Sequence, residues 1–124
     1  MNITVLKFDQ FLIASIQVAM DDNDLVELQE TLIDEVGRYR ARGVIIDVTA
    51  LDVLDSFAAR TLGTMAHSIR LRGATTVIVG IQPEVAFAMV QLGLRLDGVH
   101  TALDLEEGMA YLNRLYPRSA GRAG

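Results

Sequence analysis

The residues with the clearest chemical potential lie around Ser56, in the stretch LDSFAART. Ser56 follows an apolar run and a loop that carries Asp52 and Asp55, and it precedes a helical pattern. Either Asp55 or Ser56 could be the N-cap of that helix. If Asp55 is the cap, the Ser56 hydroxyl stands at the first helical position, where free backbone N–H groups and the helix dipole favour an added phosphate. The pattern therefore predicts either a plain cap or a phosphate acceptor.

Catalysis by Ser56 is disfavoured because no general base is placed to serve it. The stretch lacks the Gly-x-Ser-x-Gly turn of hydrolases, and His67 lies about three turns further along the same predicted helix. His67 and His100 are the only histidines and Cys is absent, so the sequence lacks the histidine spacing and the thiolates typical of zinc sites. We expect structural roles for both histidines, and neither a metal nor a cofactor.

Nucleotide binding and phosphoaspartate chemistry are disfavoured as well. Lys7 is the only lysine and does not belong to a phosphate-binding loop, and the first connections hold no glycine-rich dinucleotide fingerprint. Asp47 ends an apolar run and could accept a phosphate, as in a receiver domain. Such domains use an acidic pair after the first strand and a late lysine, and both are missing here. We therefore expect Asp47 to cap or brace the loop that follows it.

The elements that must position these residues alternate along the chain. Short apolar runs predict five strands, at Val5–Phe8, Phe11–Gln17, Val44–Thr49, Thr75–Gly80 and Val99–Leu103. Helical spacing predicts four helices. The first starts near Asp22 or Asn23 and is closed by Gly43, and the second runs from Ser56 to near Gly73. The third has Pro83 at its first position and is closed by Gly93, and the fourth has an apolar side made of Leu105, Met109, Leu112 and Leu115.

This order predicts an α/β fold with a mostly parallel sheet, an antiparallel edge hairpin and four flanking helices. We expect one domain over residues 1–116 and a flexible C-terminal tail over 117–124. The formal charge of −5 makes nucleic acid a poor partner. No apolar run approaches the ~20 residues that cross a bilayer, and the start does not resemble a secretory signal. With no Cys, the chain fits a cytoplasmic protein.

Four stretches of the chain resemble the STAS domain, the fold of anti-sigma-factor antagonists. They are VIIDVT, ALDVLDSFAARTL, VIVGIQPEVAFAMVQLGL and TALDLEEGMAYLNRL, within a similarity that runs from about Val5 to Leu115. The Ile16-Gln17 pair, the DSF stretch and GIQPEVA are more similar to the RsbS branch, the small single-domain subunit of the bacterial stressosome. Phe57 and Ala58 depart from the general antagonist pattern and are shared with that branch.

The resemblance implies a non-enzymatic scaffold that is regulated by phosphorylation. In the family, the serine at the position of Ser56 is phosphorylated by an RsbT-type serine kinase and reset by an RsbX-type phosphatase. The unmodified protein assembles with RsbR-type STAS co-antagonists into a large core that holds the kinase, and the phosphorylated core releases it. Asp55, Ser56 and Phe57 would form the docking surface, and the chain would form a homo-oligomer, expected to be a dimer, within the assembly.

The third predicted helix, which begins at Pro83, contains no Ser or Thr. RsbR-type domains tend to carry a second phosphorylatable threonine near this place, so the resemblance implies a subunit with one site. The alternative is a STAS-type small-molecule sensor, since some domains of the family bind ligands. A pocket at the carboxyl ends of the strands, near Asp47 and Ser56, would favour that alternative.

Overall fold

A computed structural model of the chain describes residues 3–118, and its elements follow the predicted order. The strands are β1 (Val5–Phe8), β2 (Phe11–Ser15), β3 (Gly43–Asp47), β4 (Thr75–Val79) and β5 (His100–Ala102). The helices are α1 (Asp22–Tyr39), α2 (Ser56–Leu71), α3 (Pro83–Gln91) and α4 (Leu105–Leu115). The predicted α/β fold, with its antiparallel edge hairpin and four helices, is confirmed.

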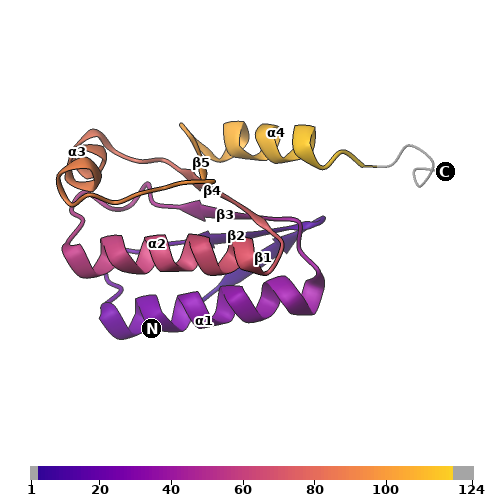
Figure 1. The fold of residues 1–124 in the computed structure, drawn as a ribbon, viewed down its shortest axis with the longest axis horizontal. Coiled ribbons are helices and arrows are strands. Elements are labelled where there is room, and N and C mark those ends of the chain that lie inside the picture. The colour runs from indigo at the N-terminus through magenta and orange to yellow at the C-terminus, as the bar shows by residue number, and fades with distance from the viewer. Residues whose placement is uncertain (1–2, 119–124) are drawn as a thin grey trace.

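The five strands form one sheet in the order β1-β2-β3-β4-β5. β1 pairs antiparallel with β2, and the remaining pairs are parallel. The parallel strands end at the same edge of the sheet, where α1 and α2 begin and α3 lies (Figure 1). In such sheets, functional groups gather beyond the carboxyl ends of the strands.

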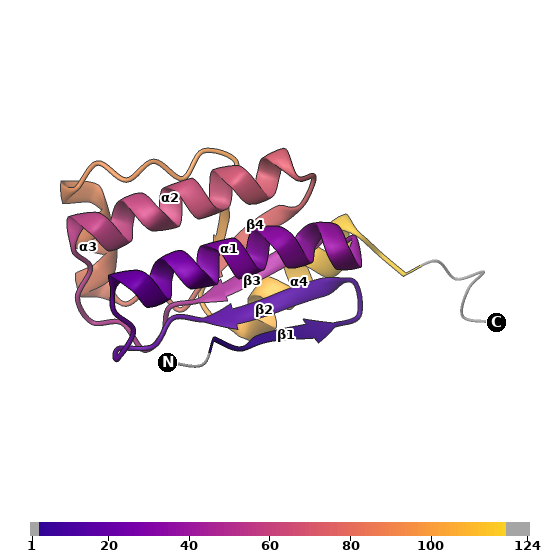
Figure 2. The same ribbon diagram turned by 90° about the horizontal axis from the view of Figure 1, so that it is seen from below.

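The helices cover the two faces of the sheet unequally, as Figure 2 shows. α1 and α2 lie side by side on one face, over a large apolar core that includes Leu12, Val44 and Ile78. α4 alone covers part of the other face, over a smaller core around Phe11 and Ile45. β3 is buried on both faces, which explains why its sequence is apolar without alternation.

The start of α1 agrees with the prediction and its end does not. The helix begins at Asp22, and Asp21 is its N-cap and forms a reciprocal capping box with Asp24. The backbone N–H of Asp21 donates to Asp24 and holds the pKa of that carboxyl below its usual value. The helix ends before Gly43, since Arg40 adopts a left-handed conformation with φ of 52°.

Gly43 is instead the first residue of β3, and its role is close packing. A Cβ at this position would lie 2.8 Å from a methyl carbon of Leu112. Gly108 has the same role on α4, because a Cβ there would lie 2.7 Å from Val79. The two glycines let α4 approach the sheet closely, so burial on this helix centres on Gly108 and Leu112. Leu105 and Leu115, predicted on the same side, remain 40% and 46% exposed because they lie at the helix ends.

The second strand also differs in detail from the prediction. β2 ends at Ser15, two residues before Gln17, although the Ile16 N–H still donates to the carbonyl of Asp47 at 2.9 Å. In the predicted tail, the Arg118 guanidinium lies 3.1 Å from a carboxylate oxygen of Asp9. Residues 119–124 lie outside the described part of the chain. Within residues 3–118, none of the helices has the length and apolar character that a membrane crossing requires.

Candidate functional site

Ser56 occupies the first position of α2 and is exposed. The N-cap is Asp55, whose side chain accepts a hydrogen bond from the backbone N–H of Ala58 at 2.8 Å. The choice that the sequence left open is thus decided in favour of Asp55. The Ser56 hydroxyl is not required for capping, and it stands at the surface where the helix presents its free N–H groups.

The residues around Ser56 anchor its position from the core side. Leu54, two residues earlier, is buried, and Phe57 is half-buried against the main core. The Phe57 carbonyl accepts a hydrogen bond from the Thr61 hydroxyl at 2.9 Å. Phe57 was predicted to belong to a docking surface together with Asp55 and Ser56, but only part of its ring is available to a partner. Asp55 and Ser56 are exposed.

Asp47 braces the loop that leads from β3 toward Ser56, as predicted. Its Oδ1 accepts hydrogen bonds from the Thr49 backbone N–H at 2.9 Å and from the Thr49 hydroxyl at 2.6 Å. Gln82, just before α3, donates from its side chain to the Thr49 carbonyl at 2.7 Å. Gly80 packs against Thr49 with φ of +77°, and a Cβ there would overlap the Thr49 hydroxyl. These contacts join the loops after β3 and β4.

A depression of about 400 Å³ contains Ser56 and two arginines that the sequence reading missed. Arg60 lies one helical turn after Ser56, and Arg95 comes from the connection after α3. Arg95 also pairs loosely with Asp97 at 3.6 Å, and both side chains are largely exposed. The spacing of Arg60 from Ser56 is visible in the sequence. Arg95 could be found only from the fold.

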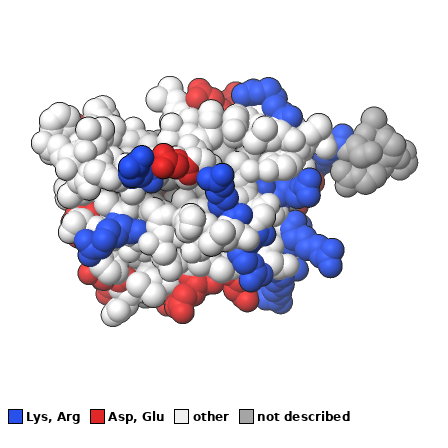
Figure 3. All heavy atoms as spheres, viewed as in Figure 1, with Lys and Arg blue, Asp and Glu red and all other residues white. Residues whose placement is uncertain are grey.

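Charge is distributed unevenly along the α1–α2 face. Exposed carboxylates surround the starts of the two helices, namely Asp21, Asp22, Asp52 and Asp55. Arginines gather where the helices end, at Arg38, Arg40, Arg42, Arg70 and Arg72, and Figure 3 shows this basic end. Ser56 therefore lies at the acidic end of the molecule, with Arg60 and Arg95 as the nearby cations in its depression.

A hollow of about 180 Å³, which we call the helix-start hollow, opens beside Asp55. It lies between the connection from β2 to α1 and the start of α2. Its lining comprises Ile16, Gln17, Val18, Met20, Asp22, Leu25, Leu51, Val53, Asp55, Ala58, Thr61, Leu62 and Met65. The sensor alternative required a pocket near Asp47 and Ser56, and this hollow is lined by Asp55 but by neither of those two residues.

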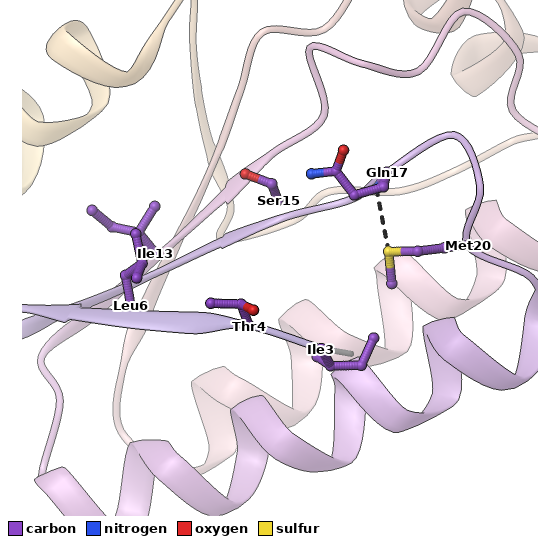
Figure 4. A pocket seen from close by; sticks show the side chains of 7 residues that line it. All are labelled: Ile3, Thr4, Leu6, Ile13, Ser15, Gln17 and Met20. Carbon is purple, nitrogen blue, oxygen red and sulfur yellow. Dashed lines mark hydrogen bonds between the residues drawn. The ribbon is translucent and has the colours of Figure 1, made fainter. Parts of the chain in front are cut away.

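A second hollow, of about 190 Å³, lies along the edge strand and is called here the edge-strand hollow. Its lining comprises Ile3, Thr4, Leu6, Ile13, Ser15, Gln17 and Met20, drawn in Figure 4. The Gln17 backbone N–H donates to the Met20 sulfur at 3.2 Å. Gln17 and Met20 line both hollows, so this connection separates them.

The remaining candidates lie away from Ser56 or have structural contacts. His67 is exposed on α2, and His100 stacks on Tyr111 with ring centroids 3.6 Å apart. Lys7 donates to the carbonyl of Asp9 and lies 5.8 Å from the Tyr39 ring, at the end of the sheet opposite Ser56. Among residues 3–118, no group of three His, Cys, Asp or Glu side chains is placed to hold a metal ion.

Comparison with known families identifies the fold and its relatives. The model of the STAS domain matches residues 2–108, which is most of the chain. The chain belongs to the STAS family. STAS proteins that act as anti-sigma-factor antagonists are generally non-enzymatic, and the structure of one of them, SpoIIAA, shares this fold with a TM-score of 0.68 at 10% identity.

Two solved structures are related to this STAS domain in both sequence and fold. A serine-to-glutamate variant of RsbS from Moorella thermoacetica is 30% identical with a TM-score of 0.85, covering 95% of this chain and 100% of that one. A chain in a structure of the stressosome, described as a signal integration and transduction hub, is 32% identical with a TM-score of 0.82, covering 93% and 100%.

Curated relatives include RsbT co-antagonist proteins of Bacillus subtilis (strain 168). RsbRA is 29% identical over 102 residues, covering 82% of this chain and 37% of the relative. RsbRC is 28% identical over 83 residues, covering 67% and 29%. The chain thus spans about a third of the length of these relatives. This STAS domain is related to both the RsbS and the RsbR proteins.

Proposed function

We propose that this STAS domain is a phosphorylation-controlled scaffold and antagonist of the RsbS type. In its unmodified form it sequesters an RsbT-type serine kinase within a cytoplasmic stressosome that also contains RsbR-type co-antagonists. Phosphorylation of Ser56 releases the kinase, and an RsbX-type phosphatase restores the serine. The observation that carries the proposal is the exposed Ser56 hydroxyl at the start of α2, which the Asp55 cap leaves available.

The chemical step is a phosphoryl transfer that the kinase carries out. The Ser56 oxygen bonds to the γ-phosphorus of ATP while the bond to the bridging oxygen breaks, and ADP leaves. A base on the kinase takes the serine proton. Ser56 is therefore the acceptor, and this domain supplies only the position of the hydroxyl.

Release follows from the charge that the transfer adds. A phosphoserine carries about −1.5 to −2 charges at neutral pH. Asp52 and Asp55 are already on this surface, so a kinase that packs on Ser56 and the exposed part of Phe57 would face a concentrated negative charge after transfer. Burying that charge against the kinase is costly. We expect the docked kinase to dissociate while the domain keeps its fold.

The test is incubation with the cognate RsbT-type kinase and ATP, followed by mass spectrometry of phosphopeptides. We expect phosphate on the wild type and on Ser15→Ala, a matched exposed serine on β2, and none on Ser56→Ala. Phosphate at another residue, or its absence from the wild type, would disprove the proposal. Ser56→Asp should weaken kinase capture, by less than phosphoserine does because it carries less charge.

The assembly is tested separately by mass measurement in solution. We expect a homo-oligomer, with a dimer as its unit, and a much larger particle when an RsbR-type partner is added. An unchanged mass after mixing would contradict the scaffold role, whatever the outcome at Ser56.

A small-molecule sensor is the second candidate, and the helix-start hollow is the observation in its favour. Its volume of about 180 Å³ limits a ligand to a small group, and its lining combines apolar side chains with Gln17, Asp22 and Asp55. Native mass spectrometry of the purified protein would support this candidate if a bound compound appears and disappears when the hollow is filled.

A further inference from the structure

The helix-start hollow has an apolar floor whose polar groups are already satisfied. Ile16, Leu25, Leu62 and Met65 in its lining are buried. Thr61, which contributes the hydroxyl in the lining, donates to the Phe57 carbonyl at 2.9 Å. An apolar group that reaches this floor therefore gains by removing apolar surface from water, whereas a polar group finds partners only at Gln17, Asp22 and Asp55 in the lining.

The size of the hollow matches one apolar side chain. An engineered apolar cavity of about 150 Å³ holds a benzene molecule, and the helix-start hollow measures about 180 Å³. A leucine, methionine or phenylalanine side chain has the corresponding dimensions. Met20 and Met65 in the lining are flexible and can adjust to the shape of such a group.

The rim of the hollow favours a protein over a small molecule. Val18 and Val53 stand on its border and are 69% and 74% exposed. A small molecule that fills the hollow would leave much of these valines in water, whereas a protein segment lying across both connections would cover them. The charged lining residues are Asp22 and Asp55, both exposed, with neither lysine nor arginine among the lining residues. The complementary segment is apolar with an adjacent basic residue.

The position of the hollow indicates which protein would supply the segment that covers it. Asp55 lines the hollow and directly precedes Ser56 in the chain. A protein that reaches the Ser56 hydroxyl must lie over this part of the surface, and in the proposed function that protein is the kinase.

We propose that the helix-start hollow receives an apolar anchor side chain of the captured kinase, with a basic residue of the kinase facing Asp22 and Asp55. This inference rests on the proposed function. The anchor contact holds the kinase on the unmodified protein and sets the affinity of capture, whereas the charge that phosphorylation adds at Ser56 decides release. Two parts of one surface thus have separate tasks.

The test compares two exposed valines in kinase binding. Val53→Ser removes a rim methyl pair, and Val90→Ser makes the same change on α3 at a valine that is 80% exposed and does not line the hollow. We expect Val53→Ser to raise the dissociation constant of the unmodified protein for the RsbT-type kinase about tenfold. Val90→Ser should change it less than about twofold. Isothermal titration calorimetry measures both.

A second variant tests the interior of the hollow. Ala58 lines it from the first turn of α2, and Ala58→Leu fills it while keeping the backbone N–H that Asp55 caps. We expect capture to fall at least as far as in Val53→Ser, with the melting temperature not lowered. Ser56 should still be phosphorylated at high kinase concentration, because the acceptor itself is unchanged.

The outcomes separate this inference from the proposed function. If the wild type captures no kinase, both are overturned. If the wild type captures it and Val53→Ser and Ala58→Leu bind as Val90→Ser does, only the anchor site is overturned. The anchor site is likewise overturned if these variants change the oligomeric mass of the protein without kinase and leave kinase capture unchanged, since a second copy of the chain then occupies the hollow. If the variants lose a bound compound in native mass spectra and still capture the kinase as the wild type does, the hollow binds a small molecule instead.

Discussion

The helix-start hollow and the edge-strand hollow have nearly the same volume, about 180 and 190 Å³, and share Gln17 and Met20. They differ in what surrounds them. The first lies between two connections at the start of α1 and α2 and continues into the main core. The second lies on the part of the sheet near β1, away from the strands that α4 covers, where Leu6 is 59% exposed.

The comparison shows that volume does not indicate function in this domain. The helix-start hollow is functionally relevant because Asp55 lines it and Ser56 follows Asp55 in the chain. The edge-strand hollow has neither, and its walls come from β1, β2 and the segments that flank them rather than from packed helices. Substitutions in the two hollows should therefore differ in their effect on stability as well as on binding.

The largest difference in the free energy of unfolding is expected between Leu62→Ala and Leu6→Ala. Leu62 is 1% exposed in the floor of the helix-start hollow, and its truncation should lower the free energy of unfolding by about 2–5 kcal/mol. Leu6 lines the edge-strand hollow and is mostly exposed, so its truncation should cost less than about 1 kcal/mol. Urea denaturation measures both. Equal losses would show that the two hollows are equally well packed.

The next effect concerns the braced loop that forms one wall of the helix-start hollow. Gly80→Ala combines a positive φ with overlap on the Thr49 hydroxyl, and we expect a loss of about 2–3 kcal/mol. Gly93→Ala is the control, because its φ is also positive but nothing lies within 4 Å of the added Cβ; its cost should be about 1 kcal/mol.

The readout that relates this pair to the hollows is the methyl spectrum by NMR. Gly80→Ala should shift the methyl resonances of Leu51 and Val53, which follow Thr49 in the loop, and leave the methyl resonances of Leu6 unchanged. Shifts of Leu6 as large as those of Val53 would mean that the two hollows respond as one unit.

The smallest effect is expected at the helix cap. Asp55→Ala should lower the free energy of unfolding by about 1 kcal/mol, because the Ala58 N–H loses its acceptor. Asp55→Asn should lose less, since asparagine caps nearly as well. If the kinase places a basic residue over this wall, both variants should weaken capture alike. Capture that follows the stability loss alone would mean that Asp55 acts only as a cap. Thermal unfolding and kinase titration distinguish these results.

The sequence by itself determined the order of the elements and the chemical character of the Ser56 region. Alternating apolar runs and helical spacing follow from which faces must be buried, and this information is local. It was enough to predict the α/β fold, the start of α2 and the bracing role of Asp47. It could not choose between Asp55 and Ser56 as cap, because both side chains offer the same kind of acceptor and only the backbone path decides.

The tertiary structure alone decided which distant residues meet. Arg95 joins Ser56 in one depression from the connection after α3, and Val18 and Val53 line the helix-start hollow from two different connections. The exposed ends of α4 are another case, since the same apolar spacing buried Leu112 and left Leu105 at the surface. Periodicity states which side of a helix is apolar, but the closeness of approach at Gly43 and Gly108 sets how much of that side is covered. Sites made by several connections depend on packing of this kind, which no short stretch of sequence encodes.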